Sequence, residues 1–191
     1  EVYERIDFSG QGASPASFPS LAGRCAVVNG VSKAYAMTGF RLGYLAADPR
    51  LASACAKLQG QSTTCAAGVS QRAALAALGS DPRLVADMVA AYARRRDLVV
   101  SRLEALPGVS VFRPEGAFYA FPELRGLEAW RLAPEGRRSA AVSGLLLEKA
   151  LVATVPGSAF GDDSAIRLSF ATSEAKLTEA LDRIARVMRS S

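Results

Sequence analysis

The sequence has 191 residues, a net charge of +5 at pH 7 and a pI near 9.4, and 50% of its residues are hydrophobic. This composition predicts a globular protein that buries a hydrophobic core, and no apolar run reaches the ~20 residues of a membrane-spanning helix. Histidine is absent, which excludes imidazole bases, histidine-containing triads and histidine metal ligands.

The basic excess does not by itself indicate a nucleic-acid partner. Residues 94–96 form the only tight arginine run, and no nucleic-acid motif or interleaved aromatic pattern accompanies it. A solvated helix face is the simpler interpretation. Cys25, Cys55 and Cys65 lie too far apart for a disulfide framework or zinc site, so we expect reduced, buried thiols. Without a signal segment at its start, the sequence predicts a cytoplasmic protein with no membrane partner.

The first part of the chain is predicted to contain two short buried strands. Residues 1–4 are typical of a strand end that enters a loop, and residues 8–23, rich in Gly, Ser and Pro, predict a surface loop. The apolar runs over 25–28 and 42–47 predict the two strands. Their connection contains several reactive side chains and two glycines, and such loops often carry function.

Lys33 is the reactive group of this connection. A lysine beside a cation in a partly dry pocket loses some preference for its charged form, and the neutral amine can then attack a carbonyl. The hydroxyl of Ser32 and the guanidinium of Arg41 are suited to holding a phosphate, because arginine offers a planar fork of donors. A lysine beside a phosphate grip suggests pyridoxal phosphate. From the residues alone, a solvated lysine and a strand-edge arginine remain alternative interpretations.

Helices are predicted after the second strand. Asp48 and Asp81 each precede a proline, a combination that caps a helix start and fits its first position. We expect helices over 49–59, 70–78 and 82–106. The last of these would span roughly 37 Å, at about 1.5 Å per residue. That length is sufficient to bridge two domains.

The pattern from residue 109 onward predicts an α+β unit with antiparallel strands under helices. Arg167 lies among apolar residues of one predicted strand, so its guanidinium must be paired or must face a pocket. From the residues alone, Arg167 could form either a structural ion pair or part of a ligand site. The expected elements are strands over 109–111, 117–121, 152–155 and 166–171, a loose charged insertion over 123–138, a helix over 142–151, and a final helix capped by Ser173.

Several blocks of the sequence resemble one known family. Residues 29–44 read NGVSKAYAMTGFRLGY, and the blocks PEGAFY, VPGSAFG and IRLSFA follow at 114–119, 155–161 and 166–171. Together with Glu-Val-Tyr-Glu at 1–4, they resemble the class I aminotransferases of fold type I, in the same order. The resemblance is strongest to the bacterial aspartate and prephenate aminotransferase branch.

The resemblance implies an α/β fold and only part of a longer protein. It places the C-terminal part of the pyridoxal-phosphate-binding large domain at 1–80, an interdomain helix at 81–106 and a small C-terminal α+β domain at 107–191. In the family, an aspartate that pairs with the pyridine nitrogen would come directly before Glu1. We therefore expect this chain to be a C-terminal half, with the missing N-terminal half as its partner and a homodimer as the complete protein.

The same resemblance implies the roles of five residues. Lys33 would be the catalytic residue that carries pyridoxal 5'-phosphate, with Tyr3 on the ring hydroxyl of the cofactor. Ser32 and Arg41 would hold its phosphate, and Arg167 would bind the α-carboxylate of the substrate. The implied reaction is amino-group transfer between an amino acid, of the aspartate or glutamate type or an aromatic precursor, and a 2-oxo acid, without a metal.

The block at 29–44 departs from the family at two positions. Gly30 occupies a place where relatives usually carry a second serine that touches the phosphate, which implies either a weaker cofactor grip or a grip by backbone amides. Phe40 stands where tryptophan is common, a conservative exchange. One alternative of another class is a non-catalytic, aminotransferase-like sensor or dimerisation module. A second is a nucleic-acid binder, whose affinity would depend strongly on salt.

Overall fold

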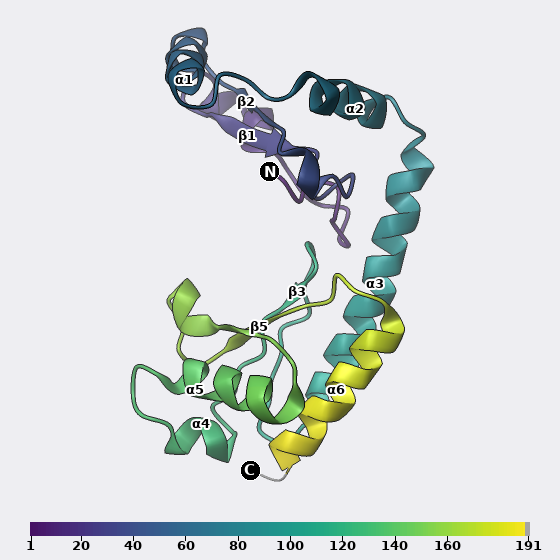
Figure 1. Cartoon of the computed structure of the whole chain (residues 1–191), viewed down its shortest axis with the longest axis vertical. Helices are drawn as coiled ribbons and strands as arrows, with labels where there is room; N and C mark the ends of the chain where they lie inside the picture. The colour runs from purple at the N-terminus through teal and green to yellow at the C-terminus, as the bar shows by residue number, and fades with distance from the viewer. Residues whose placement is uncertain (190–191) are drawn as a thin grey trace. The chain divides into compact units, whose positions relative to one another are not determined.

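Figure 1 shows the computed structural model of the chain, which describes residues 1–189. The chain divides into two compact units, Glu1–Val89 and Ala90–Ser191. The long helix α3 (Pro82–Glu104) contributes to both units, because the boundary falls inside it. The helix predicted over 82–106 is therefore confirmed, while the division at 80 and 106 and the role of α3 as an interdomain helix stay predictions.

The sheet of the first unit is a two-stranded antiparallel hairpin. It consists of β1 (Val27–Gly30) and β2 (Gly43–Ala46), with Gly30 opposite Gly43 at its closed end. Both predicted strands are present, although β1 begins two residues later than expected. Their predicted burial is wrong for β2, which has no buried residue, and holds in β1 only for Asn29 and Gly30. Residues 31–42 form the connection, a turn followed by a short 3-10 helix over Thr38–Phe40.

The segment before the hairpin consists of turns. The Glu4 N–H donates to the Glu1 carbonyl at 2.9 Å and the Ile6 N–H donates to the Tyr3 carbonyl at 2.8 Å. The strand end predicted over 1–4 is therefore wrong, because these hydrogen bonds close tight turns in place of a strand ladder. The loop predicted over 8–23 is confirmed and contains two 3-10 turns, Pro15–Ser17 and Pro19–Leu21.

Asp7 organises the start of this loop, and we predict that it titrates at unusually low pH. Its carboxylate accepts hydrogen bonds from the hydroxyl and N–H of Ser9 and from the Gly12 N–H, at 2.7 to 2.8 Å. These bonds favour the ionised form, and the Ser9 hydroxyl bond is the largest cause that lowers the pKa of Asp7 from 3.8 to about 2. Since the pKa is lower in the folded chain, the stability that Asp7 contributes is present above about pH 4 and is lost as the pH falls towards 2.

Carboxyl carbon NMR measures this titration directly. Ser9→Ala is expected to raise the pKa of Asp7 towards its ordinary value. Ser17→Ala is the matched control, because its hydroxyl bonds the Ser14 carbonyl and not Asp7. An Asp7 pKa that is the same in Ser9→Ala and in the unchanged chain would contradict the assignment.

Two helices complete the first unit and expose much of their apolar surface. α1 (Pro49–Ser62) begins at the expected cap, where Asp48 accepts a hydrogen bond from the Arg50 N–H at 3.0 Å, and α2 (Gly68–Leu78) follows. Cys55 and Cys65 are exposed here, so the expectation of buried thiols is wrong for both. Cys55 lies on α1, none of whose residues is buried within the described chain, and Cys65 lies in the exposed connection between α1 and α2. Exposed apolar side chains include Leu58, Val69 and Leu75, at 73%, 78% and 64% exposure.

The sheet of the second unit has three antiparallel strands. β5 (Ile166–Ser169) lies between β3 (Tyr119–Ala120) and β4 (Val155–Pro156). The predicted antiparallel arrangement is confirmed, but the strand predicted over 109–111 is wrong. Among the described residues, that segment contributes only an isolated bridge between Ser110 and Glu123.

Two backbone features explain why the strands of this sheet are shorter than predicted. Ala117 adopts a φ of 57°, and Pro114 has no N–H for a ladder, so pairing stops on both sides of the turn between them. Leu151 adopts a φ of 55° at the end of a π-helical turn, Leu146–Ala150, and delays β4 until Val155. Tertiary pairing, and not the apolar pattern alone, therefore sets these strand ends.

The helices of the second unit surround its core. α4 (Glu128–Leu132) lies inside the segment predicted as a loose insertion, and α5 (Arg138–Leu145) begins earlier than the predicted helix over 142–151. α6 (Glu174–Arg189) is the predicted final helix and runs beside α3, as Figure 1 shows. Ion pairs from Arg102 to Asp182 and from Arg94 to Glu174 link these two helices. The largest fully buried side chains of this unit include Leu103, Leu124, Leu146, Ile166, Phe170 and Ile184.

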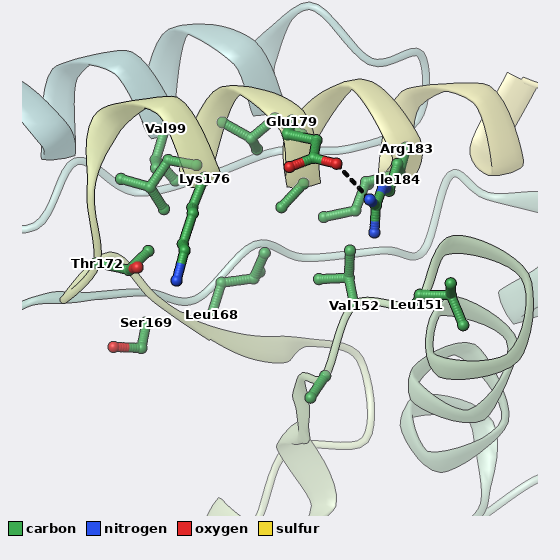
Figure 2. A pocket seen from close by; sticks show the side chains of 14 residues that line it. Val99, Leu151, Val152, Leu168, Ser169, Thr172, Lys176, Glu179, Arg183 and Ile184 are labelled. Carbon is green, nitrogen blue, oxygen red and sulfur yellow. Dashed lines mark hydrogen bonds and ion pairs between the residues drawn. The ribbon is translucent and has the colours of Figure 1, made fainter.

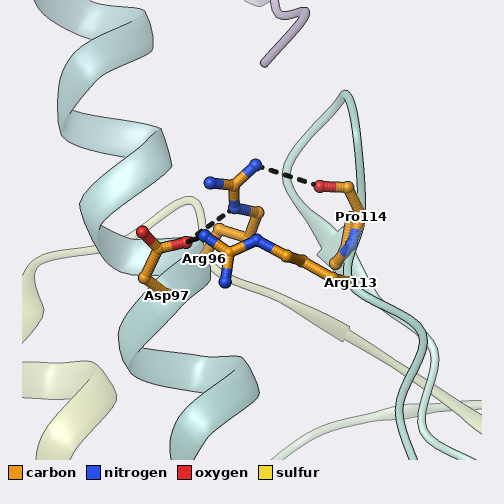
Figure 3. A network of polar contacts seen from close by, with 4 residues as sticks. All are labelled: Arg96, Asp97, Arg113 and Pro114. Carbon is orange, nitrogen blue, oxygen red and sulfur yellow. Dashed lines mark hydrogen bonds and ion pairs between the residues drawn. The ribbon is translucent and has the colours of Figure 1, made fainter. Parts of the chain in front are cut away.

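A polar network fixes the turn before β3 to α3 (Figure 3). The Arg96 side chain is only 12% exposed and donates to Asp97 at 2.8 Å and to the Pro114 carbonyl at 3.3 Å. Arg113 donates to the same Asp97 carboxylate at 2.6 Å. Arg96 is the main reason that the pKa of Asp97 lies below its usual range. The backbone that leads to Tyr119 is thereby held on one face of α3.

Candidate active site

Lys33 lies in a tight turn directly after β1. The Tyr35 N–H donates to the Val31 carbonyl and the Ala36 N–H donates to the Lys33 carbonyl, each at 3.2 Å. Val31 and Ala34 on either side are 0% and 2% exposed, whereas Lys33 itself is half-buried. Because buried apolar neighbours flank this turn, the backbone position of Lys33 is well defined.

Ser32 and Arg41 share the β1–β2 connection with Lys33. Ser32 is half-buried next to the lysine, whereas Arg41 is exposed and adopts a left-handed φ of 51°. The Arg41 guanidinium donates to the Thr38 carbonyl at 2.9 Å. Among residues 1–189, its other N–H groups have no protein acceptor. An amine, a hydroxyl and an arginine fork are therefore present on one short segment.

Gly30 lies close to the backbone of the opposite strand. A Cβ placed on Gly30 would come within 2.8 Å of the Leu42 carbonyl oxygen and 3.1 Å of the Gly43 Cα. Such a contact with backbone requires the hairpin to shift. The hairpin therefore favours glycine at this position over a residue with a Cβ.

Tyr3 belongs to a segment that contacts β1. The backbone nitrogen of Glu1 donates to the Val28 carbonyl at 2.6 Å, and Ser14 donates to the Glu1 carboxylate at 2.7 Å. Tyr3 is half-buried and lines a surface hollow of about 600 Å³ together with residues 1–5 and 12–14. β1 thus connects this hollow to the turn of Lys33, within the same unit.

Arg167 lies on β5 in the second unit, between two aromatic rings. Its guanidinium carbon is 4.4 Å from the ring centroid of Tyr119 and 4.6 Å from that of Phe160. No carboxylate of the described residues lies within ion-pair distance of it, so the structural ion pair considered from the sequence is not formed. A guanidinium held by aromatic faces keeps its N–H donors available in the plane of the fork.

Sequence reasoning missed Tyr119 and Phe160 as site residues. Both lie inside blocks that were noted for their resemblance, PEGAFY and VPGSAFG. Phe160 is 51% exposed and contacts Phe121 edge-on, with ring centroids 5.9 Å apart. The signal that could have identified them is an aromatic residue near a turn glycine in each block, three residues after Gly116 for Tyr119 and directly before Gly161 for Phe160.

An apolar cavity of about 370 Å³ lies elsewhere in the second unit (Figure 2). Leu168 of β5 and Leu177 and Ile184 of α6 line it, and Lys176 extends over it towards Thr172. Its lining contains none of the five predicted site residues. In the part of the chain that the structure describes, no group of acidic or cysteine side chains is arranged to hold a metal ion.

Comparison with known proteins identifies the family. The family model "Aminotransferase class I and II" matches residues 1–184, so the chain belongs to this family of amino-group-transferring enzymes. An aspartate aminotransferase of Rhizobium meliloti (strain 1021) is 45% identical over 97% of this chain and 46% of that protein. An aspartate/prephenate aminotransferase of Nitrosomonas europaea is 40% identical over 98% of this chain and 49% of that protein.

Solved structures confirm the predicted fold class. The crystal structure of the aspartate aminotransferase from Rhizobium meliloti matches with a TM-score of 0.90 and 44% identity, over 98% of this chain and 48% of that chain. The fold is therefore the C-terminal part of a fold type I aminotransferase, and the chain spans about half the length of the curated relatives it matches. Among residues 1–189, no helix combines the length and apolar character needed to cross a membrane.

Proposed function

We propose that the complete protein containing this chain is a pyridoxal-phosphate-dependent aminotransferase. It moves an amino group between an amino acid, of the aspartate or glutamate type or an aromatic precursor, and a 2-oxo acid. The observation that carries this proposal is Lys33, held in a tight turn after β1 with Ser32 and Arg41 on the same connection. The names of the relatives, aspartate aminotransferase and aspartate/prephenate aminotransferase, support the substrate class.

The residues of the connection fit pyridoxal 5'-phosphate. The cofactor requires an amine for its carbonyl group and several donors for its phosphate. Lys33 supplies the amine, and the Ser32 hydroxyl and the available Arg41 donors suit the phosphate. The absence of a Cβ at Gly30 keeps its backbone close to the Leu42 carbonyl at the start of the same connection. Tyr3, across β1, suits the ring hydroxyl.

Two residues of this chain would then have direct roles in the reaction, Lys33 and Arg167. The bound cofactor supplies an electron sink for the bond broken at the substrate α-carbon. The Lys33 amine moves the proton of that carbon as a general base and acid. Arg167 holds the substrate carboxylate with two parallel hydrogen bonds, and this orientation aligns the bond to be broken. The residue that selects a second carboxylate is not among these five.

We also propose that other parts of the complete protein cover the apolar surface of α1 and α2. Exposed side chains such as Leu58 and Val69, at 73% and 78% exposure, support this view, because exposed apolar patches generally mark interaction sites. The partners in this proposal are the N-terminal half and a second copy, which would form a homodimer. A cytoplasmic location belongs to the same proposal.

Covalent trapping tests the assignment of Lys33. We expect that reduction with borohydride in the presence of pyridoxal phosphate adds one cofactor per chain, and that peptide mapping finds it on Lys33. The chain has three further lysines, Lys57, Lys149 and Lys176, which serve as internal controls. Intact mass spectrometry gives the stoichiometry of the adduct.

Matched variants make the trapping experiment decisive. Lys33→Arg keeps the charge but removes the primary amine, so the adduct should disappear. Lys57→Arg, on α1, should leave it unchanged. An adduct spread equally over all four lysines would contradict a special role for Lys33, and no adduct in a complete protein would favour the non-catalytic module.

A further inference from the structure

We propose that Ser139 and Asp163 are positioning residues for Arg167, because they hold the turn that places Phe160 on its guanidinium. This inference rests on the proposed role of Arg167 as the carboxylate-binding residue. It concerns groups that do not touch the substrate themselves. Ser139, Asp163, Phe160 and Arg167 all belong to the second unit.

Ser139 links α5 to this turn. It is 0% exposed, and its hydroxyl donates to the Asp163 carboxylate at 2.7 Å. The same hydroxyl accepts a hydrogen bond from the Ser158 N–H at 3.2 Å. Ser158 lies in the 3-10 turn Gly157–Phe160, two residues before the stacked ring. A buried hydroxyl that donates and accepts in this way fixes both partners.

Asp163 is itself fixed to the start of α5. Its carboxylate accepts hydrogen bonds from the backbone N–H groups of Arg138 and Ser139, at 3.0 and 2.9 Å, at the start of α5. A carboxylate is favourable there because the first N–H groups of a helix have no partner within the helix. The Trp130 indole also donates to the Asp163 carbonyl at 2.9 Å. Hydrogen bonds from Ser139 are the main reason that the pKa of Asp163 lies below its usual range.

Phe160 needs such an anchor because burial alone does not hold it. The ring is 51% exposed, and its centroid lies 4.6 Å from the Arg167 guanidinium carbon. Arg167 has no ion pair with the described residues, so its two stacked rings define where its fork points. Loss of the hydrogen bond from the Ser158 N–H to Ser139 would leave the turn to its backbone hydrogen bonds alone and lower the fraction of time that the ring stacks on Arg167.

NMR of the 191-residue chain measures this stacking without any ligand. Aromatic rings displace the resonances of a guanidinium that stacks on them. The Nε–Hε signal of Arg167, assigned with Arg167→Lys, therefore reports its stacking on Tyr119 and Phe160, which together form its ring cage. Phe160→Leu defines the displacement caused by that ring. Ser139→Ala is expected to move the signal most of the way to the Phe160→Leu position. Titration with succinate should show an affinity about three- to tenfold weaker in Ser139→Ala, the range of one cation–π contact.

Ser143→Ala is the matched control. Ser143 is also a buried serine of α5, but its hydroxyl bonds Thr154 and not the turn of Phe160. This variant should lose comparable stability and leave the Arg167 signal in place. An unmoved signal in Ser139→Ala, or an equal movement in Ser143→Ala, would overturn the proposal.

A second variant covers the case in which Ser139→Ala does not fold. Asp163→Asn keeps an oxygen acceptor for Ser139 but removes the charge at the start of α5, and it should move the Arg167 signal in the same direction. If Asp163→Asn leaves that signal in place, the proposal is wrong. If succinate fails to shift the Arg167 signal in the unchanged chain, the carboxylate role is wrong, while the stacking result still decides the positioning role.

Discussion

Replacement of Gly157 by alanine is expected to destabilise the second unit by about 3 kcal/mol, the upper end of the usual cost of overpacking. A Cβ at this position would collide with the Asp162 carbonyl oxygen and with the Ala165 carbonyl oxygen. Both obstacles are backbone atoms of the same turn. The Ala165 carbonyl accepts a hydrogen bond from the Gly157 N–H at 2.8 Å, and the Asp162 N–H donates to the Gly157 carbonyl at 3.1 Å. Relief of the contact would therefore break the turn that carries Phe160.

Gly144→Ala is the control for this substitution. Gly144 lies in α5, and a Cβ there would meet nothing within 4 Å. Alanine is a better helix former than glycine, so this variant should gain about 0.5 to 1 kcal/mol. Urea unfolding followed by the fluorescence of Trp130, the single tryptophan, reports on the same unit. Equal loss of stability in both variants would show that the close approach at Gly157 is not the cause.

Local signals in the sequence predicted most of the helices. Asp48 and Asp81 each accept a hydrogen bond from the backbone N–H two residues later, so the helix starts at both positions are confirmed. Such caps are decided by neighbouring residues, and a sequence shows them directly. The strand predicted over 109–111 failed for the opposite reason. Its apolar residues alternate as in a strand, but the turn around Pro114 allows only one bridge to form.

The residues of the candidate site also differ in whether local sequence or long-range pairing determines their position. Lys33, Ser32 and Arg41 are close in sequence and share one connection, so a local pattern together with the family resemblance was enough to single them out as candidates. The cage of Arg167 depends on strand pairing, because Tyr119 lies opposite Ser169, two residues along β5 on the same face as Arg167. This register is a long-range property that no local pattern contains. The fit at Gly30 is likewise visible only once β1 and β2 are paired.

Substitution of Arg167 by leucine is expected to lower the kcat/KM of the complete protein for its amino acid about 100-fold or more, because loss of one partner of a charged, doubly hydrogen-bonded pair costs about 2 to 5 kcal/mol. Arg167→Lys keeps the charge but loses the fork and the stacking on Tyr119 and Phe160. Its loss should be smaller than that of Arg167→Leu. Steady-state kinetics with each variant over a range of amino acid concentrations gives both values.

The split between KM and kcat decides what Arg167 does. A carboxylate contact that is equally strong throughout the reaction raises KM alone, whereas one that orients the bond to be broken also lowers kcat. We expect both changes for Arg167→Leu, since a misaligned substrate binds weakly and reacts slowly. Arg131→Leu is the control, because Arg131 is exposed on α4, away from the ring cage. If Arg167→Leu and Arg131→Leu had the same kinetics, Arg167 would be a structural residue and the carboxylate site would have to lie elsewhere in the complete protein.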